Sequence, residues 1–236
     1  MSRGRERLRA MPRDRLLAEF SLWSADLVHL ADEIARVDQY VDLYHIDVAD
    51  GHFSPALLYF PDLVAAVRKR TDKPLHVHLM VADAILMEQV AQFAEAGADL
   101  ISVHAENANA VAALDLLENR GMATGIVLQL HTPVEAARAF VSRLDVLTLL
   151  GTRIGIKGQG LDPDAESRLT HGRSLISASG HPVLLAADGG IREHTVPGLR
   201  AAGADTIVMG SLAFNDPDLA GRISWVHGLA APATHA

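Results

Sequence analysis

The amino-acid sequence predicts a single-domain (β/α)8 barrel, the TIM-barrel fold, and three observations support this prediction. Short, almost continuously apolar runs rich in Val, Ile and Leu recur along the chain, as expected of parallel strands buried on both faces. Amphipathic stretches separate these runs, which indicates βαβ units. The tetrapeptide AGAD occurs at 96–99 and at 202–205, an offset of 106 residues that spans four expected strands. Eight units of about 26 residues need about 210 residues, which this chain can supply.

The expected elements start after an arginine-rich segment, residues 1–15, which holds six arginines and which we expect to be a mobile basic arm outside the fold. The barrel is expected to occupy residues 16–228, followed by a C-terminal tail at 229–236. Its strands are predicted, in order, at 16–21, 43–48, 74–80, 100–104, 124–130, 145–150, 182–187 and 206–210.

Two of the connecting helices have a clear apolar face. The spacing predicts a helix over 83–96, with Asp83 capping its start, Gly97 ending it, and Leu86, Val90 and Phe93 on one face. Residues 108–120 repeat the pattern with Val111, Leu114 and Leu117. A doubly wound open sheet is the alternative fold, but no G-x-G-x-x-G motif follows the first expected strand.

Composition excludes several classes of function. The net charge of −8 argues against general binding to nucleic acid or to an acidic membrane, and no apolar run approaches the roughly 18 residues of a membrane span. The chain contains no cysteine, so disulfides, cysteine zinc sites and cysteine nucleophiles are impossible. This is compatible with the cytoplasmic location that we expect. A barrel of this size commonly self-associates, so we also expect a homo-oligomer.

Ionisable side chains gather at the carboxyl ends of the expected strands, where barrels of this kind place their chemistry. His45 and Asp47 are two residues apart on the second strand and therefore share one face. His78 lies near the end of the third strand, and Asp188 follows the seventh. Two imidazoles and two carboxylates can bind one divalent ion such as Zn²⁺, Fe²⁺ or Mn²⁺. Individually, each histidine could be a packed core residue and each aspartate a turn former; His76 is given no role.

Glycine-bearing loops follow the last three expected strands, with the sequences GIKGQG (155–160), DGG (188–190) and MGS (209–211). Glycines let backbone N–H groups approach an anion, and the loops after the seventh and eighth strands are the common phosphate site of this fold. We expect phosphate to contact Gly155, Lys157, Gly158, Gly189, Gly190, Gly210 and Ser211. Lys157 would add a positive charge there; its alternative is a solvated loop lysine.

Several motifs together resemble the ribulose-phosphate 3-epimerases, metal-dependent TIM barrels that invert C3 of ketose phosphates. The likeness runs from about Ser21 to Phe214 and includes SLWSADL (21–27), HIDVADGHFSP (45–55), HLMV (78–81), TPVE (132–135), GQ (158–159), DGGI (188–191) and GADTIVMGS (203–211). The resemblance implies that His45, Asp47, His78 and Asp188 bind the metal. It also implies that Asp47 and Asp188 transfer protons, and that Ser21, His78 and Met80 contact the substrate.

The sequence departs from the pattern of this family around the expected pocket. Ala49 and Leu150 stand where the family usually has methionine, and Arg153, Ile154, Lys157 and Ala56 are further differences. None of these differences removes a predicted metal ligand. We therefore expect inversion at C3 of a sugar phosphate, with ribulose 5-phosphate or another pentulose, hexulose or tetrulose phosphate as substrate. Two alternatives are a phosphosugar lyase or decarboxylase on the same barrel, for which Ala49 replaces the expected lysine, and a non-catalytic phosphosugar-binding protein.

Overall fold

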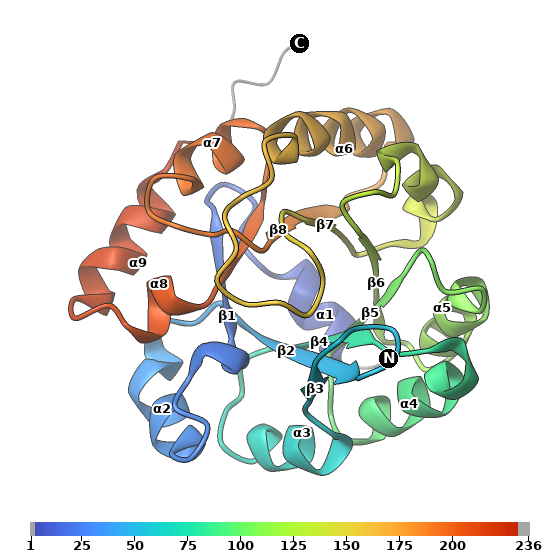
Figure 1. Ribbon diagram of the computed structural model, residues 1–236, viewed down its shortest axis with the longest axis horizontal. Helices are drawn as coiled ribbons and strands as arrows, with labels where there is room; N and C mark the ends of the chain where they lie inside the picture. Colours follow the sequence, from blue (N-terminus) through green and yellow to red (C-terminus); the bar gives the residue numbers. More distant parts are fainter. Residues whose placement is uncertain (1–2, 231–236) are drawn as a thin grey trace.

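Eight parallel strands close into a barrel within residues 3–230, the part of the chain that this computed structural model describes (Figure 1). Going around the barrel, the strands follow the order β1-β2-β4-β5-β6-β7-β8-β9, and β9 pairs back onto β1. The predicted fold class, a single-domain (β/α)8 barrel, is therefore confirmed.

The eight barrel strands begin and end within two residues of their predicted limits. They are β1 (Leu17–Ser21), β2 (Leu43–Asp50), β4 (Leu75–Met80), β5 (Leu100–His104), β6 (Ala123–Leu128), β7 (Val146–Leu150), β8 (Leu184–Asp188) and β9 (Thr206–Met209). A two-residue strand that the sequence did not predict, β3 (Leu57–Leu58), pairs antiparallel with the end of β2. It turns the segment after β2 back over the rim of the barrel.

Helices cover the outside of the barrel, and Figure 1 shows them as a ring around the strands. They are α2 (Leu30–Val37), α3 (Pro61–Arg68), α4 (Asp83–Glu95), α5 (Ala110–Asn119), α6 (Ala165–Ser179), α7 (Val196–Ala201), α8 (Ser211–Phe214) and α9 (Leu219–Gly228). Short 3-10 helices lie after β1 (η1, Leu22–Ser24), after α2 (η2, Asp38–Tyr40) and after β6 (η3, Val134–Ala139; η4, Val141–Arg143). No helix within residues 3–230 is long and apolar enough to cross a membrane.

The two predicted helices are present, with two differences in detail. Asp83 is the first helical residue of α4, and its carboxylate accepts the backbone N–H groups of Ala108 and Asn109 instead of capping its own helix. It therefore joins the start of α4 to the loop before α5. Val111, predicted on the apolar face of α5, is 51% exposed, because Ala110 and Ala113 occupy the buried side together with Leu114 and Leu117.

The N-terminal segment contradicts the expectation of an arm outside the fold. Residues 3–9 form a helix, α1 (Arg3–Arg9), whose Leu8 is 1% exposed and packs inside the amino end of the barrel against Leu17, Leu100, Val146 and their neighbours. Arg5 pairs with Asp145 at 3.0 Å and Arg7 with Asp99 at 3.4 Å. The arginine-rich composition hid this role, because a single apolar residue of the helix, Leu8, makes the buried contact with the barrel. The last residues of the predicted tail, 231–236, lie outside the described residues.

Candidate active site

A cavity of about 400 Å³ opens at the carboxyl end of the barrel, where the sequence predicted the chemistry. Its walls include Ser21 at the end of β1, Asp47 from β2, His78 and Met80 from β4, and Asp188 from β8. These strands are buried and their neighbours are fixed by the barrel register, in which Ser21 lies opposite His45 and Asp47 opposite His78. Rigid strand ends thus bring together side chains that are up to 167 residues apart in sequence.

The four predicted metal ligands meet at one point. One ligand atom from each of His45, Asp47, His78 and Asp188 lies within 4.8 Å of all the others. His45 Nε2 is 3.2 Å from Asp47 Oδ1 and 3.8 Å from Asp188 Oδ2. His78 Nδ1 is 3.5 Å from Asp47 Oδ1 and 3.6 Å from Asp188 Oδ2. The predicted cluster is therefore present as a compact group of two nitrogens and two oxygens.

This group fits a divalent cation. His78 Nδ1 is buried and has no hydrogen-bond partner among the described residues, although two carboxylates face it. A cation between these atoms would satisfy the nitrogen and both carboxylates at once, and mixed nitrogen and oxygen donors suit Zn²⁺, Fe²⁺ or Mn²⁺. Behind the cluster, His45 Nδ1 is 2.8 Å from Glu19 Oε1, which is the usual support for a ligating histidine.

The two aspartates have opposite pKa shifts. Burial alone would raise the pKa of Asp47, but the charge and hydrogen bond of His45, and the nearby imidazole of His78, lower it well below its usual range. Ser21 Oγ also donates a hydrogen bond to Asp47 Oδ2 at 2.8 Å. Burial raises the pKa of Asp188. The charge of His45 opposes this shift, and the negative charge of Asp47 increases it. Two carboxylates whose environments push their pKa values apart are typical of acid/base pairs.

Comparison with known proteins identifies the group to which this architecture belongs. The sequence model described as the ribulose-phosphate 3 epimerase family matches residues 17–214. The chain belongs to the ribulose-phosphate 3-epimerase family. It is 35% identical over 211 residues to the ribulose-phosphate 3-epimerase of Bacillus subtilis, covering 88% of this chain and 96% of that protein. It is 34% identical over 216 residues to that of Synechocystis sp., covering 90% and 93%. The predicted enzyme class, an isomerase of the epimerase type, is confirmed.

Solved structures of low sequence identity share the fold. A 3-hexulose-6-phosphate synthase from Salmonella typhimurium superposes with a TM-score of 0.68 at 15% identity, covering 91% of this chain and 98% of that one. An orotidine 5'-phosphate decarboxylase from Pyrococcus horikoshii gives a TM-score of 0.64 at 15% identity, covering 89% and 97%. These similarities concern the barrel alone.

The expected phosphate loops of this family member form the other wall of the cavity. Their predicted residues, Gly155, Lys157, Gly158, Gly189, Gly190, Gly210 and Ser211, all line it. Gly189 and Gly190 have φ values of 89° and 72°, and a Cβ on either would lie less than 3 Å from Thr152 or Leu161. Only glycine fits this turn, and without side chains at these positions the backbone N–H groups can approach a ligand in the cavity.

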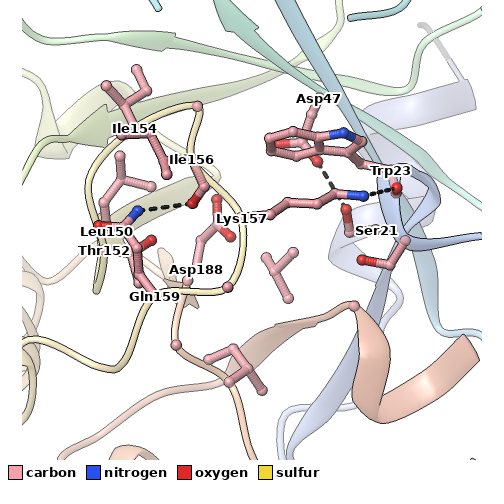
Figure 2. A pocket seen from close by; sticks show the side chains of 18 of the residues that line it. Ser21, Trp23, Asp47, Leu150, Thr152, Ile154, Ile156, Lys157, Gln159 and Asp188 are labelled. Carbon is pink, nitrogen blue, oxygen red and sulfur yellow. Dashed lines mark hydrogen bonds between the residues drawn. The ribbon is translucent and has the colours of Figure 1, made fainter. Parts of the chain in front are cut away.

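Lys157 crosses the mouth of the cavity. Its ammonium donates a hydrogen bond to the backbone carbonyl of Trp23 and lies 4.7 Å from the centre of the Trp23 ring. Figure 2 shows the side chain reaching from the loop after β7 toward Trp23 and Ser21, with Asp188 nearby. Burial lowers the pKa of Lys157, and the charge of Asp47 opposes that shift. Lys157 is nevertheless exposed overall, so its contact with phosphate stays a prediction beside the alternative of a solvated loop lysine.

Two departures from the family pattern have different positions. Leu150 lines the cavity, as Met80 does, whereas Ala49 is 4% exposed and is not among the cavity-lining residues. A smaller residue at position 49 therefore does not alter the cavity wall, whereas Leu150 does, together with the further departures Arg153, Ile154 and Lys157.

Sequence reasoning missed a set of buried polar residues beneath and beside the cluster. Glu19 and His76 lie inside the barrel, where His76 Nδ1 contacts Glu19 and His76 Nε2 is 2.7 Å from Ser102 Oγ. Burial would raise the pKa of Glu19, but the charge of His76 and the hydrogen bond of His45 lower it to about 2. Strand periodicity could have found both, because Glu19 and Ser21, like His76 and His78, are two residues apart and share a face. His104 and Glu106, at the end of β5, were also missed.

Proposed function

We propose that this chain is a metal-dependent epimerase that inverts C3 of a ketose phosphate by two-base proton transfer through an enediolate. The observation that carries the proposal is the meeting of two histidines and two aspartates within 4.8 Å at the bottom of the cavity. Ribulose 5-phosphate is the first substrate to test, because the family and the curated relatives are named for it. Other pentulose, hexulose and tetrulose phosphates follow.

In this proposal His45, Asp47, His78 and Asp188 hold one divalent ion, Zn²⁺, Fe²⁺ or Mn²⁺. When bound, the ion stabilises negative charge that develops on the substrate oxygens at C2 and C3. The C3 proton beside a ketone is weakly acidic, so its removal needs a base held in place as well as this charge stabilisation.

Asp47 and Asp188 supply the two proton-transfer groups. Inversion requires that one group removes a proton from one face of the planar enediolate and that another returns a proton to the opposite face. The two carboxylates come from β2 and β8, on either side of β1 and β9 in the barrel. Ser21 keeps Asp47 oriented through its 2.8 Å hydrogen bond and contacts the substrate, as do His78 and Met80.

The phosphate end of the substrate rests on the glycine-bearing loops after β7, β8 and β9. Backbone N–H groups at Gly155, Gly158, Gly189, Gly190, Gly210 and Ser211 approach the dianion, and Lys157 adds a positive charge. This binding energy fixes C3 between the two carboxylates. A homo-oligomeric state and a cytoplasmic location stay predictions.

The test is proton exchange at C3. Metal-loaded protein is incubated with a panel of ketose phosphates in D₂O, and C3 is followed by NMR. Deuterium gain together with inversion supports the proposal. Loss of a carbon fragment would support a lyase or decarboxylase, and binding without exchange would support a phosphosugar-binding protein; either result contradicts the epimerase assignment.

A further inference from the structure

His78 meets a second imidazole on the side facing away from the cavity. His78 Nε2 lies 2.9 Å from Nε2 of His104, the last residue of β5. Their ring centres are 5.0 Å apart and the ring planes are 28° apart, so the rings meet edge to edge, as in an N–H···N hydrogen bond. Both side chains are buried, with 2% of His78 and none of His104 exposed. Water therefore does not compete for this contact.

A carboxylate lies at the far end of His104. His104 Nδ1 is 3.2 Å from Glu106 Oε2. The other oxygen, Glu106 Oε1, accepts the backbone N–H of Gln129 at 3.0 Å and the hydroxyl of Thr132. Burial would raise the pKa of this carboxyl, but its hydrogen bonds to His104 and Thr132 lower it to about 2. At neutral pH Glu106 therefore acts only as an acceptor.

Glu106 accepts at one end of the series His78–His104–Glu106, and this fixes the direction of both hydrogen bonds in the series. Since Glu106 can only accept, a neutral His104 carries its proton on Nδ1 and presents a lone pair at Nε2. His78 must then donate from its own Nε2. The remaining nitrogen, His78 Nδ1, is left with a lone pair directed toward Asp47 and Asp188, 3.5 Å and 3.6 Å away. This is the same atom that has no hydrogen-bond partner within residues 3–230.

We infer that His104 and Glu106 are positioning residues that hold His78 in the one tautomer able to bind the metal and aim its lone pair at the cation site. The inference rests on the metal site of the proposed function. Neither residue touches the substrate, because neither lines the cavity. The other histidine of the cluster has a carboxylate directly behind it, Glu19 behind His45. For His78 the same support passes through a second imidazole.

The test measures metal binding apart from turnover. Metal-free wild type and variants are titrated with Co²⁺ in competition with a chromophoric chelator, and the visible spectrum of bound Co²⁺ reports its coordination. In His104→Phe the ring remains but both nitrogens are lost. In His104→Gln the amide oxygen can still accept from His78. Thr148→Val is the matched control, since Thr148 is also buried in the barrel with an unpartnered hydroxyl among the described residues.

We expect His104→Phe to weaken Co²⁺ binding about 10- to 100-fold and to change the spectrum, since loss of the partner behind a ligating histidine has this cost. His104→Gln should recover most of the affinity, and Thr148→Val should match wild type. Should His104→Phe fail to fold, Glu106→Gln should show a loss in the same direction, of about 10-fold, while the exposed Glu135→Gln shows none.

Steady-state kinetics add a second readout. Because His104 does not touch the substrate, His104→Phe at saturating metal should lower kcat and leave KM close to that of wild type. Wild-type Co²⁺ affinity and spectrum in both His104→Phe and Glu106→Gln would overturn the inference. The titration decides it even if no ketose phosphate is turned over, so its failure is distinguishable from failure of the proposed function.

Discussion

Replacing each of the two clustered aspartates by asparagine tests which face of the substrate each one serves. In a two-base epimerase, one carboxylate removes the C3 proton from one epimer and the other removes it from the opposite epimer. Asp188→Asn and Asp47→Asn should both abolish inversion. Each variant should keep slow C3 exchange, without inversion, for one epimer only, and the two variants should keep it for opposite epimers.

The size of the loss follows from the position of the carboxylates. Asp188 Oδ2 lies 3.6 Å and 3.8 Å from the two imidazole nitrogens, so the substitution removes a proton acceptor and also one negative charge from the ligand set. General acid/base catalysis alone contributes about 10²- to 10⁴-fold. We therefore expect kcat for inversion to fall at least about 10³-fold, or about 4 kcal/mol of transition-state stabilisation.

The assay is NMR of C3 in D₂O, started separately from each purified epimer, with the metal content of every variant measured. Folding is checked without metal. Removing the Asp188 charge relieves its burial and its repulsion by Asp47, which together raise the pKa of that carboxyl, so Asp188→Asn should be as stable as wild type. Asp47→Asn should be less stable, because His45 loses the charge of its hydrogen-bond partner. Turnover like that of wild type in Asp188→Asn, or retention of the same epimer by both variants, would refute the two-base assignment.

Three further predictions concern substrate binding and stability. Lys157→Ala should raise KM for a ketose phosphate about 10-fold and change kcat less, because a charge-assisted contact to a dianion contributes about 1.5 kcal/mol; an unchanged KM would exclude phosphate contact. Leu8→Ala should lower the free energy of unfolding by about 2–3 kcal/mol in urea denaturation and leave kcat unchanged, whereas Leu27→Ala, at a residue 51% exposed, should have little effect. Asp42→Asn should destabilise the fold at pH 7 by about 2 kcal/mol. Burial would raise the pKa of Asp42, but hydrogen bonds from His227 and Arg15 lower it from 3.8 to about 2, so the stabilisation is complete above pH 3.8 and disappears as the pH falls through about 2. Urea denaturation between pH 2 and pH 7 measures the difference, and a difference that persists at pH 2 would contradict this cause.

The barrel could be predicted from sequence because its strands are buried on both faces. Continuous apolar runs such as 100–104 have no other stable environment in a chain of this length, and the structure confirms that strand without a shift of either end. The predicted metal ligands could be found from the sequence for a related reason. The carboxyl ends of parallel strands meet at one rim of the barrel, so residues at those ends lie close together. The helix after β6 could not be predicted, because η3 and η4 replace it with short 3-10 turns that leave no 3.6-residue pattern.

The inside of the barrel was harder to predict than its rim. Glu19 and His104 lie in sequence segments that are apolar as a whole. The sequence alone does not show which residue a single polar side chain in such a segment contacts. Their partners are set by the register, which pairs β1 with β2 and β4 with β5. These strand pairings bring Glu19 behind His45 and His104 behind His78.

This arrangement explains why a cluster of charges can be tolerated at the base of an apolar barrel. A buried imidazole with an unassigned tautomer could turn its proton toward the two carboxylates and form an ion pair that competes with a cation. The hydrogen bond from His104 to Glu106 opposes that option for His78, since reversing it would leave two acceptors, His104 Nδ1 and Glu106 Oε2, facing each other at 3.2 Å. In the proposed function, the preference of the site for a cation over a proton would therefore depend on His104 and Glu106, which belong neither to the cavity wall nor to the predicted ligand set.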